Sequence, residues 1–348
     1  MSIRAHFQSW ISRQWQKKGI WAWVTSPLAL AYGLIASKRR EAYLSGKQKP
    51  YRAPVPVLVI GNIYVGGTGK TPLACAIAEL LQRQGWHPGL VSRGYGRLND
   101  ATVATGQGPD LDWQEFGDEP ALIAHKTGMP VSVHQNRAQA AELLLARFAQ
   151  TDIIISDDGL QHYGLARDFE ILVQDDRGTG NGFLLPAGPL RESLERLNEV
   201  DLVLTRSTHI RIGLEPGFSL QIDQFWQPAT GLKLDPAQFV TQAKSQGSIA
   251  AAAGIGVPQR FFMSLLEVGI TLQDCYPLAD HAAIDLHWLN SLSAKTILIT
   301  EKDAIKLDKP IADHRIWVAQ TSVNWWRDDI DAFLTQRLAA AGIKHSES

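Results

Sequence analysis

The sequence is poor in cysteine. Cys75 and Cys275 are its two cysteines in 348 residues, and each lies within an apolar stretch far from the other. Such residues suit reduced, buried thiols better than a disulfide framework, and neither has a partner at the CxxC spacing of a structural zinc site. We therefore expect two buried thiols and a cytosolic redox environment.

The sequence also lacks internal repeats and low-complexity segments, and the part after residue 50, which is acidic overall, lacks a basic stripe with interleaved aromatic residues. The last absence disfavours a nucleic-acid partner. Hydrophobic residues make up 45% of the chain and charged residues 20%, which is ordinary for a globular protein and argues against both wholesale disorder and a polytopic membrane protein. A chain of this length can bury two medium cores, so we expect two domains.

Charge is distributed unevenly along the chain. Residues 1–50 carry nine lysines and arginines but a single acidic residue, Glu41, so a net charge of −1 leaves −9 on the remainder. Four of the eleven tryptophans also lie in this segment, beside the uncharged run 19–37. Tryptophan flanked by basic residues is typical of a membrane interface, where the rings lie at headgroup level and the cations meet anionic lipid.

The uncharged run 19–37 is close to the length of about 20 residues that a spanning helix needs, but it contains Pro27 and Gly33. Basic residues flank it on both sides, so no positive-inside bias orients it. We therefore expect residues 1–50 to form an interfacial membrane helix or helical hairpin, with a core helix packed on the body as the alternative. No small-residue cleavage site follows, which argues against a signal peptide.

From residue 51 onward, short apolar runs alternate with helical stretches, as is typical of α/β proteins. The expected strands are 55–60, 88–92, 131–133, 152–156, 170–174, 201–205, 248–253 and 296–300. The expected helices are 71–84, 119–126, 137–149 and 258–268. This pattern predicts a P-loop NTPase-like parallel sheet with helices on both faces in residues 51–215. A less regular polar stretch, 211–245, then leads into a smaller α/β domain, so that residues 216–348 form the linker and that domain.

The strongest chemical signal follows the first expected strand. Residues 66–71 read Gly-Gly-Thr-Gly-Lys-Thr between a strand and a helix, which is the context of a Walker A phosphate loop. Glycines let successive backbone N–H groups face one anion, Lys70 adds a charge for the β- and γ-phosphates, and the Thr71 hydroxyl is expected on Mg²⁺. The residues expected to bind ATP are Gly66, Gly67, Thr68, Gly69, Lys70 and Thr71. Tyr64 stands where the general pattern has its first glycine, so a chance match between structural glycines is the alternative.

A second strand ends in two acidic residues. The apolar run 152–156 is followed by Asp157, Asp158 and Gly159, which is the form of a Walker B site whose carboxylate holds Mg²⁺. An Asp-Gly turn at the end of a strand is the alternative interpretation. Together with Lys70 and Thr71, the paired acids predict a site for ATP and Mg²⁺.

Further motifs occur in order between Val55 and Leu307, and together they resemble the tetraacyldisaccharide 4′-kinases, the lipid A 4′-kinase family. These motifs are VGGTGKTP, SRGYG, GDEP, DDGLQHY, LPAGPLRES, ADH at 279–281, and TEKDAIKL. The resemblance implies an enzyme that uses ATP to phosphorylate the 4′-hydroxyl of a tetraacyldisaccharide 1-phosphate, giving lipid IV-A. It also implies a larger nucleotide-binding domain, a smaller domain, and an N-terminal helix at the cytoplasmic face of the inner membrane.

The resemblance also implies roles for individual residues. Asp118 is expected to be the catalytic carboxylate, with His281 of the second domain paired to it; the alternatives are an ordinary helix N-cap and an ordinary helix start. Glu192 is expected to join the Mg²⁺ shell, with a surface ion pair as the alternative. The residues expected near the lipid substrate are Arg93, Gln161 and His162.

Two other functions are compatible with a phosphate loop. One is a membrane-associated P-loop ATPase switch, which hydrolyses ATP without a lipid acceptor. The other is a GTPase, suggested by residues 300–303, Thr-Glu-Lys-Asp. Guanine recognition uses [NT]KxD, and Lys302 stands one place too late for that pattern, so ATP is the expected nucleotide.

Overall fold

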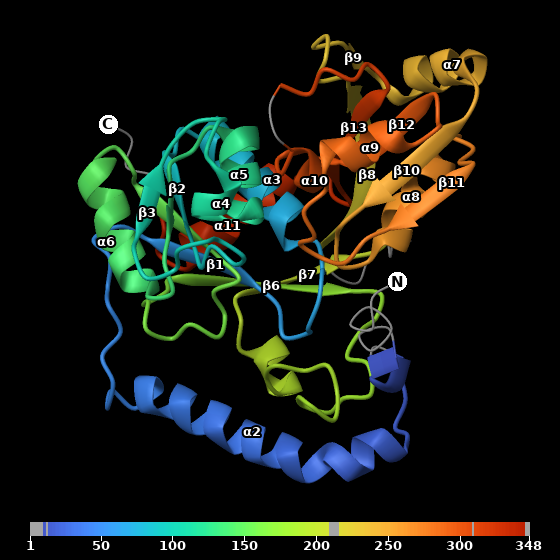
Figure 1. Cartoon of the computed structure of the whole chain (residues 1–348). Helices are drawn as coiled ribbons and strands as arrows, with labels where there is room; N and C mark the ends of the chain where they lie inside the picture. The colour runs from blue at the N-terminus through green and yellow to red at the C-terminus, as the bar shows by residue number, and fades with distance from the viewer. Residues whose placement is uncertain (1–9, 12, 209–215, 308–309, 345–348) are drawn as a thin grey trace.

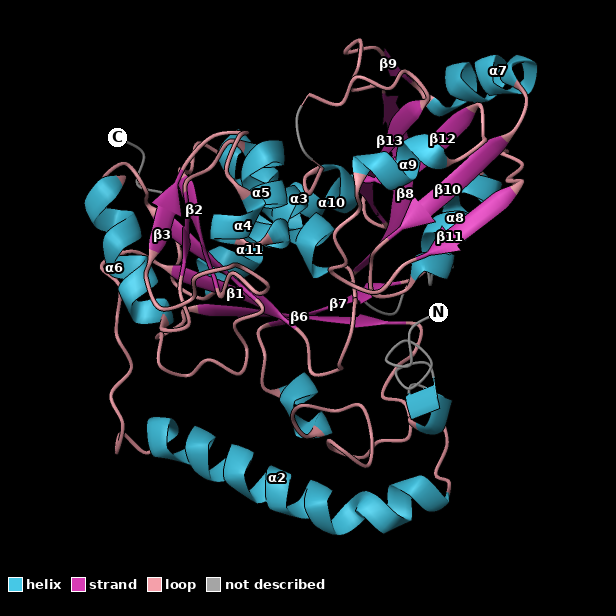
Figure 2. Cartoon of the chain, viewed as in Figure 1, coloured by secondary structure: helices cyan, strands magenta, loops and turns pink. Residues whose placement is uncertain are grey.

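One mixed sheet runs through the computed structural model, which describes residues 10–11, 13–208, 216–307 and 310–344 (Figures 1 and 2). Within these residues it has 13 strands, in the order β11-β10-β12-β13-β8-β7-β6-β1-β5-β2-β4-β3, with β9 paired to β8. Helices cover the sheet, and the long helix α2 lies apart along the outside of the molecule. The predicted α/β fold is confirmed.

The first half of the sheet carries the nucleotide-binding pattern. Its strands are β1 (Val57–Gly61), β2 (Pro88–Ser92), β3 (Ala104–Gly106), β4 (Val131–Val133), β5 (Ile153–Asp157), β6 (Phe169–Asp175) and β7 (Leu202–Arg206). All pair in parallel except β3, which runs antiparallel to β4. β1 lies between β5 and β6, so the loop after β1 lies beside the end of β5.

Helices bury both faces of this half. They are α3 (Lys70–Arg83), α4 (Trp113–Phe116), α5 (Asp118–Thr127) and α6 (Arg137–Arg147), with the short 3₁₀ helix η1 (Leu194–Asn198) farther on. Leu58 of β1 packs in one core with α3 and α5, whereas the next residue, Val59, packs in another with α6. Alternate residues of β1 therefore pack in two different cores on opposite faces of the sheet, which explains why the sequence of this strand is apolar without interruption.

The second half continues the same sheet. Its strands are β8 (Gly217–Trp226), β9 (Lys233–Leu234), β10 (Ile249–Ala253), β11 (Asp274–Pro277), β12 (Thr296–Thr300) and β13 (Ile316–Trp325). Its helices are α7 (Pro236–Gln246), α8 (Pro258–Glu267), α9 (Leu286–Ser291) and α10 (Glu301–Ala304). The stretch 211–245, expected to be irregular, therefore contains in its described part the strands β8 and β9 and most of helix α7.

Strands β8 and β13 form an antiparallel ribbon that joins the two halves. Their pairing runs from Phe218 opposite Trp325 to Trp226 opposite Val318, with a shift of register between Gln320 and Thr321. Phe218 packs in the first core and Phe225 in the core of the second half. The last helix, α11 (Ile330–Ala340), returns to the first core. Residues after 216 thus contribute to both halves.

Helix α2 (Ile20–Leu44) is a single helix, so the helical hairpin considered for this segment is not formed in its described residues. By length and composition it could cross a membrane. Its large apolar side chains are mostly exposed: Ile20, Trp23, Val24, Leu28, Leu30, Leu34, Ile35 and Leu44. Its inner face is held by Tyr32, whose hydroxyl donates to the Arg191 carbonyl (3.0 Å), and by Gly33, which packs against Leu184.

The two cysteines differ in environment. Cys75 is buried in α3, as expected, and burial raises the pKa of its thiol to about 12. Cys275 is exposed, so the expectation of a second buried thiol is wrong. It lies on β11, at the edge of the sheet, where an apolar sequence context does not guarantee a covering layer.

Candidate active site

A cavity of about 1280 Å³ lies between the two halves of the molecule. The phosphate loop, the end of β5 and the start of α5 line it from the first half, and α8 and the 279–281 turn line it from the second. Helix α2 contributes Tyr32 and Arg39. The cavity therefore borders the N-terminal helix and both halves of the sheet, the three parts of the chain that contain the predicted functional residues.

The phosphate loop is shaped by Asn62 and two glycines. The Asn62 amide donates to the Thr68 hydroxyl (2.9 Å) and to the Gly66 carbonyl (3.4 Å), which ties the exit of β1 across the loop. Gly66 and Gly69 have φ of 105° and 92°, which side chains disfavour. Helix α3 then begins at Lys70, so its free N–H groups face the loop.

Lys70 and the second acid of β5 lie close together. Lys70 Nζ is 3.4 Å from Oδ1 of Asp158, and Arg191 Nη1 donates to both oxygens of the same carboxylate (3.1 and 3.0 Å). Burial raises the pKa of Asp158, but the Lys70 and Arg191 charges outweigh this effect and hold it at about 2. Asp158 is therefore ionised beside the phosphate loop.

The first acid of the pair has the features of a cation ligand. Asp157 is 1% exposed, and its Oδ1 has no hydrogen-bond partner in the described structure. Burial, together with the charges of Glu119 and Asp158, raises its pKa to about 7. A divalent cation would satisfy this oxygen and favour the ionised form, so the residues fit Mg²⁺.

Mg²⁺ at this position would not have a cage made of protein side chains alone. No group of three or more His, Cys, Asp or Glu suited to a metal occurs among the described residues. Mg²⁺ commonly takes one or two carboxylates and completes its shell with phosphate oxygens and water. Thr71, in the first turn of α3, lines the same cavity and offers a hydroxyl.

Glu192 is placed differently from the expectation. Its carboxylate is buried, with Oε2 3.0 Å from the Tyr163 hydroxyl, which donates to it, and 2.8 Å from Arg196 Nε. Glu192 does not line the cavity. The structure therefore shows an ion pair, which is buried and not at the surface as in the alternative interpretation, and it does not place Glu192 on the wall of the cavity.

Asp118 and His281 meet across the cavity. His281 Nδ1 lies 2.9 Å from Oδ2 and 3.2 Å from Oδ1 of Asp118. Burial raises the pKa of Asp118, but the hydrogen bond from His281 and the charge of Lys302 outweigh it, so the net shift is downward. Burial lowers the pKa of His281, but Asp118 outweighs that effect and the net shift is upward. Each residue thus favours the charged form of the other.

Arg93, Gln161 and His162 also line the cavity. The Gln161 amide donates to the Asn62 carbonyl (3.1 Å), so Gln161 is tied to the phosphate loop. His162 Nε2 accepts the backbone N–H of Arg137 (3.3 Å). Burial and the charge of Arg137 lower the pKa of His162 to about 4, so its imidazole is neutral near pH 7.

Several residues at or near the phosphate loop and the cavity are not identified from the sequence. Arg177 and Arg260 both donate to the Gly67 carbonyl (3.2 and 3.3 Å), and both pair with Asp175. Arg260 comes from α8, so the second half of the chain reaches the phosphate loop. Nothing local marks these arginines, because the fold alone brings them to the loop.

Arg137 and Tyr64 did have local signals. Arg137 is buried at the start of α6 and its Nε has no hydrogen-bond partner in the described structure. Its signal in the sequence is a basic residue directly after Asn136, the residue that caps α6. Tyr64 is buried where the general loop pattern has glycine; its hydroxyl accepts a hydrogen bond from Gln16 (2.8 Å) and its ring lies under Arg177.

Comparison with known proteins gives consistent matches. A sequence profile described as Tetraacyldisaccharide-1-P 4′-kinase matches residues 21–339. The chain is 45% identical over 346 residues to tetraacyldisaccharide 4′-kinase of Bordetella petrii, covering 96% of this chain and 97% of that protein. It is 42% identical over 308 residues to the protein of the same name from Idiomarina loihiensis, covering 85% and 88%.

One solved structure shares the fold. The crystal structure of LpxK from Aquifex aeolicus in complex with ATP superposes with a TM-score of 0.74 at 24% identity, covering 92% of this chain and 99% of that one. The agreement extends over both halves of the chain.

Proposed function

This chain belongs to the tetraacyldisaccharide-1-phosphate 4′-kinase family, and on that basis we propose how its residues perform the reaction. The protein is an ATP-dependent kinase that transfers the γ-phosphate to the 4′-hydroxyl of a tetraacyldisaccharide 1-phosphate and yields lipid IV-A. The observation that carries the proposal is that the phosphate loop and the Asp118–His281 pair line one cavity. A P-loop ATPase switch without an acceptor does not require such a pair.

ATP is held by residues 66–71. The free N–H groups at the start of α3 and the Lys70 ammonium face the β- and γ-phosphates. Asp157, Asp158 and the Thr71 hydroxyl are the residues that would hold Mg²⁺. When bound, Mg²⁺ neutralises charge on the β- and γ-phosphate oxygens. The unpartnered oxygen of Asp157 supports this assignment.

The Asp118–His281 pair receives the proton of the acceptor. The 4′-oxygen forms a bond to the γ-phosphorus while the bond from that phosphorus to the bridging oxygen breaks, which releases ADP. The hydroxyl proton passes to the pair, whose two groups stabilise each other's charge. Lys70 stays beside the transferred group and stabilises the negative charge that develops there.

Arg93, Gln161 and His162 contact the sugar phosphate. Arg93 can pair with an anionic group of the lipid, either the transferred phosphoryl or the 1-phosphate. Gln161 and neutral His162 are suited to hydrogen bonds with sugar hydroxyls and amides. Their position on the cavity wall supports this assignment.

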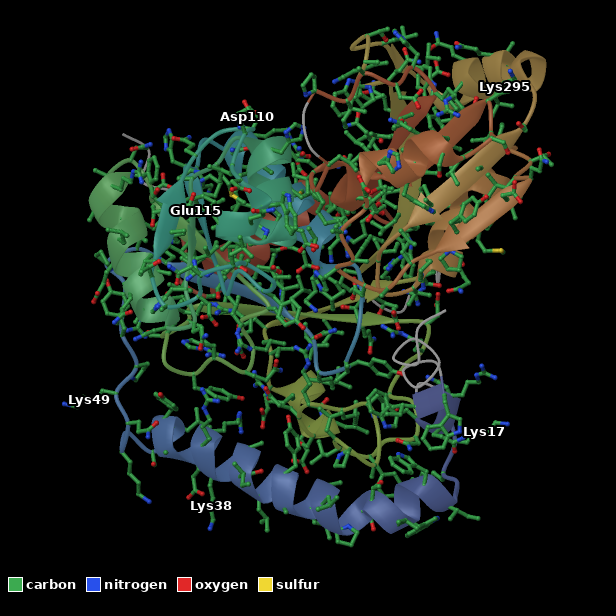
Figure 3. The ribbon with its side chains drawn as sticks, viewed as in Figure 1. Lys17, Lys38, Lys49, Asp110, Glu115 and Lys295 are labelled. Atoms are coloured by element: carbon green, nitrogen blue, oxygen red, sulfur yellow. The ribbon has the colours of Figure 1, made fainter. Side chains whose placement is uncertain are left out.

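We propose that helix α2 brings the cavity to a lipid surface. Its large apolar side chains are mostly exposed, and Figure 3 shows Lys38 of this helix, together with Lys17 and Lys49 beyond its two ends, on the side of the molecule where α2 lies. Tyr32 and Arg39 of the same helix line the cavity. We therefore place α2 in the plane of the cytoplasmic face of the inner membrane, where the acyl chains of the acceptor can remain in the bilayer.

The direct test is incubation with γ-labelled ATP and tetraacyldisaccharide 1-phosphate in mixed micelles, followed by extraction of the lipid. Label in the lipid is expected, and unlabelled GTP should compete less well than unlabelled ATP. Consumption of ATP at the same rate with and without the lipid, and no labelled lipid, would identify an ATPase switch instead. Lys70→Ala is the control for contaminating kinases.

A further inference from the structure

Helix α10 and the residues after it form a charged cluster that the reaction described above does not use. The side chains of Asp303 and Lys306 are both 0% exposed, and Lys306 Nζ lies 3.0 Å from Oδ1 of Asp303. Two ionisable groups are rarely buried so completely without a structural or functional reason, because desolvation of their charged forms is costly. The cluster contacts the turn 279–282, which carries His281.

Asp303 fixes the chain at the end of β10. Its Oδ2 accepts the backbone N–H of Gly254 (3.0 Å) and the Thr300 hydroxyl (2.7 Å). A Cβ at Gly254 would lie 2.9 Å from Oδ1 of Asp303 and 3.4 Å from the Ala279 carbonyl oxygen. The carboxylate, the glycine and the start of the 279–282 turn are therefore in close contact.

Lys306 holds the other end of that turn. Its Nζ donates to the carbonyl oxygen of Ala282 (2.7 Å), and the Ala282 N–H in turn donates to Ala279 (3.1 Å). Within the turn His281 has φ of 60°, a left-handed conformation that is uncommon for a residue with a side chain. Such a conformation persists only where surrounding contacts enforce it.

The same short helix also contacts the helix that carries Asp118. Lys302 Nζ lies 2.9 Å from Oε1 of Glu119 and 3.7 Å from Oδ2 of Asp118. The preceding residue, Glu301, forms an ion pair with Lys126 of α5. Residues 301–306 thus bind both segments whose meeting creates the Asp118–His281 pair.

We propose that Asp303 and Lys306 are positioning residues of the kinase, which hold the 279–282 turn so that His281 faces Asp118. Lys306 acts through the Ala282 carbonyl and Asp303 acts through Gly254 and Lys306. Neither residue lines the cavity, so neither contacts the substrates. The proposal rests on the role given above to the Asp118–His281 pair.

The test combines Lys306→Met with His281→Ala. Lys306→Met keeps an unbranched side chain as far as Cε but removes the Nζ that donates to Ala282, so we expect kcat to fall by about 10- to 100-fold with little change in the KM for ATP. In the His281→Ala background the same substitution should cost less than about twofold, because the residue it positions is already gone. Lys306→Arg, which keeps the charge and a donor, should recover part of the loss.

Control variants separate positioning from stability. Arg315 donates to the Leu292 and Ala294 carbonyls in the same half of the molecule. Arg315→Met therefore removes similar hydrogen bonds from a cation to backbone carbonyls away from the 279–282 turn, and it should leave kcat unchanged. Because Lys306→Met leaves a buried carboxylate unpaired, the neutral double variant Asp303→Asn/Lys306→Met is measured as well. Thermal unfolding of each variant identifies those that are folded at the assay temperature.

Three outcomes would overturn the proposal. The first is a kcat within about twofold of the original in both Lys306→Met and Asp303→Asn/Lys306→Met. The second is an equal loss of kcat on Lys306→Met in the original protein and in His281→Ala. The third is failure of both Lys306→Met and Asp303→Asn/Lys306→Met to fold, which would assign the cluster to stability alone. If His281→Ala itself leaves kcat unchanged, the role of the Asp118–His281 pair fails first. A loss in His281→Ala without a loss in Lys306→Met rejects the positioning role only.

Discussion

His281 Nδ1 lies 2.9 Å from Oδ2 of Asp118, although 163 residues of chain separate them. One residue begins α5 in the first half of the molecule, and the other lies in a left-handed turn of the second. A contact that spans both halves and borders the phosphate-loop cavity is what an acceptor site requires.

Asp118→Asn should lower kcat by about 10²- to 10⁴-fold while the KM for ATP changes little. The N-cap of α5 is Gly117, so the structure does not support the interpretation of Asp118 as an N-cap; Asp118 is the first helical residue, and its Oδ1 accepts the Glu119 N–H (2.9 Å). Asparagine keeps this acceptor and removes the carboxylate that would take the proton. Steady-state kinetics with the lipid acceptor make the measurement. If Asp118 had only a structural role at the start of α5, Asp118→Asn would leave kcat nearly unchanged.

The stabilising effect of His281 should decline as the pH rises. Because its pKa is raised above 6.5 in the folded protein, its contribution to the free energy of unfolding is complete below about pH 6.5 and is lost as pH increases through the folded-state pKa. Asp118, whose pKa is lowered, stays ionised throughout this range. Urea unfolding of the original protein and of His281→Gln should therefore differ most at pH 6 and least at pH 9; a constant difference would contradict the pairing.

Lys70→Ala should reduce phosphoryl transfer by on the order of 10³-fold, since Lys70 is the cation of the phosphate loop. Thr71→Ala should be similarly inactive, whereas Thr71→Ser should retain most activity because the hydroxyl is kept. Activity is measured with labelled ATP over a range of Mg²⁺ concentrations. Equal activities of Thr71→Ala and Thr71→Ser would show that the hydroxyl is not a ligand.

Charged substitutions on the outer face of α2 should weaken membrane binding. Leu30 and Leu34 are exposed, so Leu30→Glu and Leu34→Glu should leave the fold intact and each lower the partition coefficient for anionic vesicles about tenfold or more. Leu232→Glu, in the β9 region at the opposite end of the molecule in Figure 1, is the matched control. Equal co-sedimentation of all three variants would reject α2 as the membrane-binding element.

The native protein should expose one reactive thiol. Cys275 is exposed, whereas Cys75 is buried with its pKa raised to about 12. Titration with an aromatic disulfide reagent should therefore give one equivalent before unfolding and two after it. The variant Cys275→Ser should give none in the native state. Rapid reaction of a second thiol would mean that α3 opens readily.

Much of the first half of the chain could be predicted because its signals are local. Strand 88–92 has the predicted bounds, and helix 71–84 is displaced by a single residue at each end. In both cases an apolar run and a nearby glycine or proline mark the ends. The acidic pair and the phosphate loop follow from the same local pattern, since both lie where a parallel strand ends.

The second half was harder because long-range pairing shapes it. β8 alternates apolar and polar residues through Ile222, but the register shift opposite Thr321 puts Phe225 out of phase, and the period-two pattern breaks. The start of α7 was marked by Asp235 and Gln238, which form a capping box that was overlooked. Arg260 at the phosphate loop had no such signal, because only the folding of α8 onto Gly67 brings it there.

The β8–β13 ribbon has a mechanical consequence for the Asp118–His281 pair. A hydrogen-bonded ribbon resists sliding of one strand along the other, but its ladder is interrupted between Gln320 and Thr321, where bending and twisting are easiest. We therefore expect the two halves to bend relative to each other at this interruption. Such bending would separate Asp118 from His281 and widen the cavity at the same time, and one pair of distance labels across the halves can follow it.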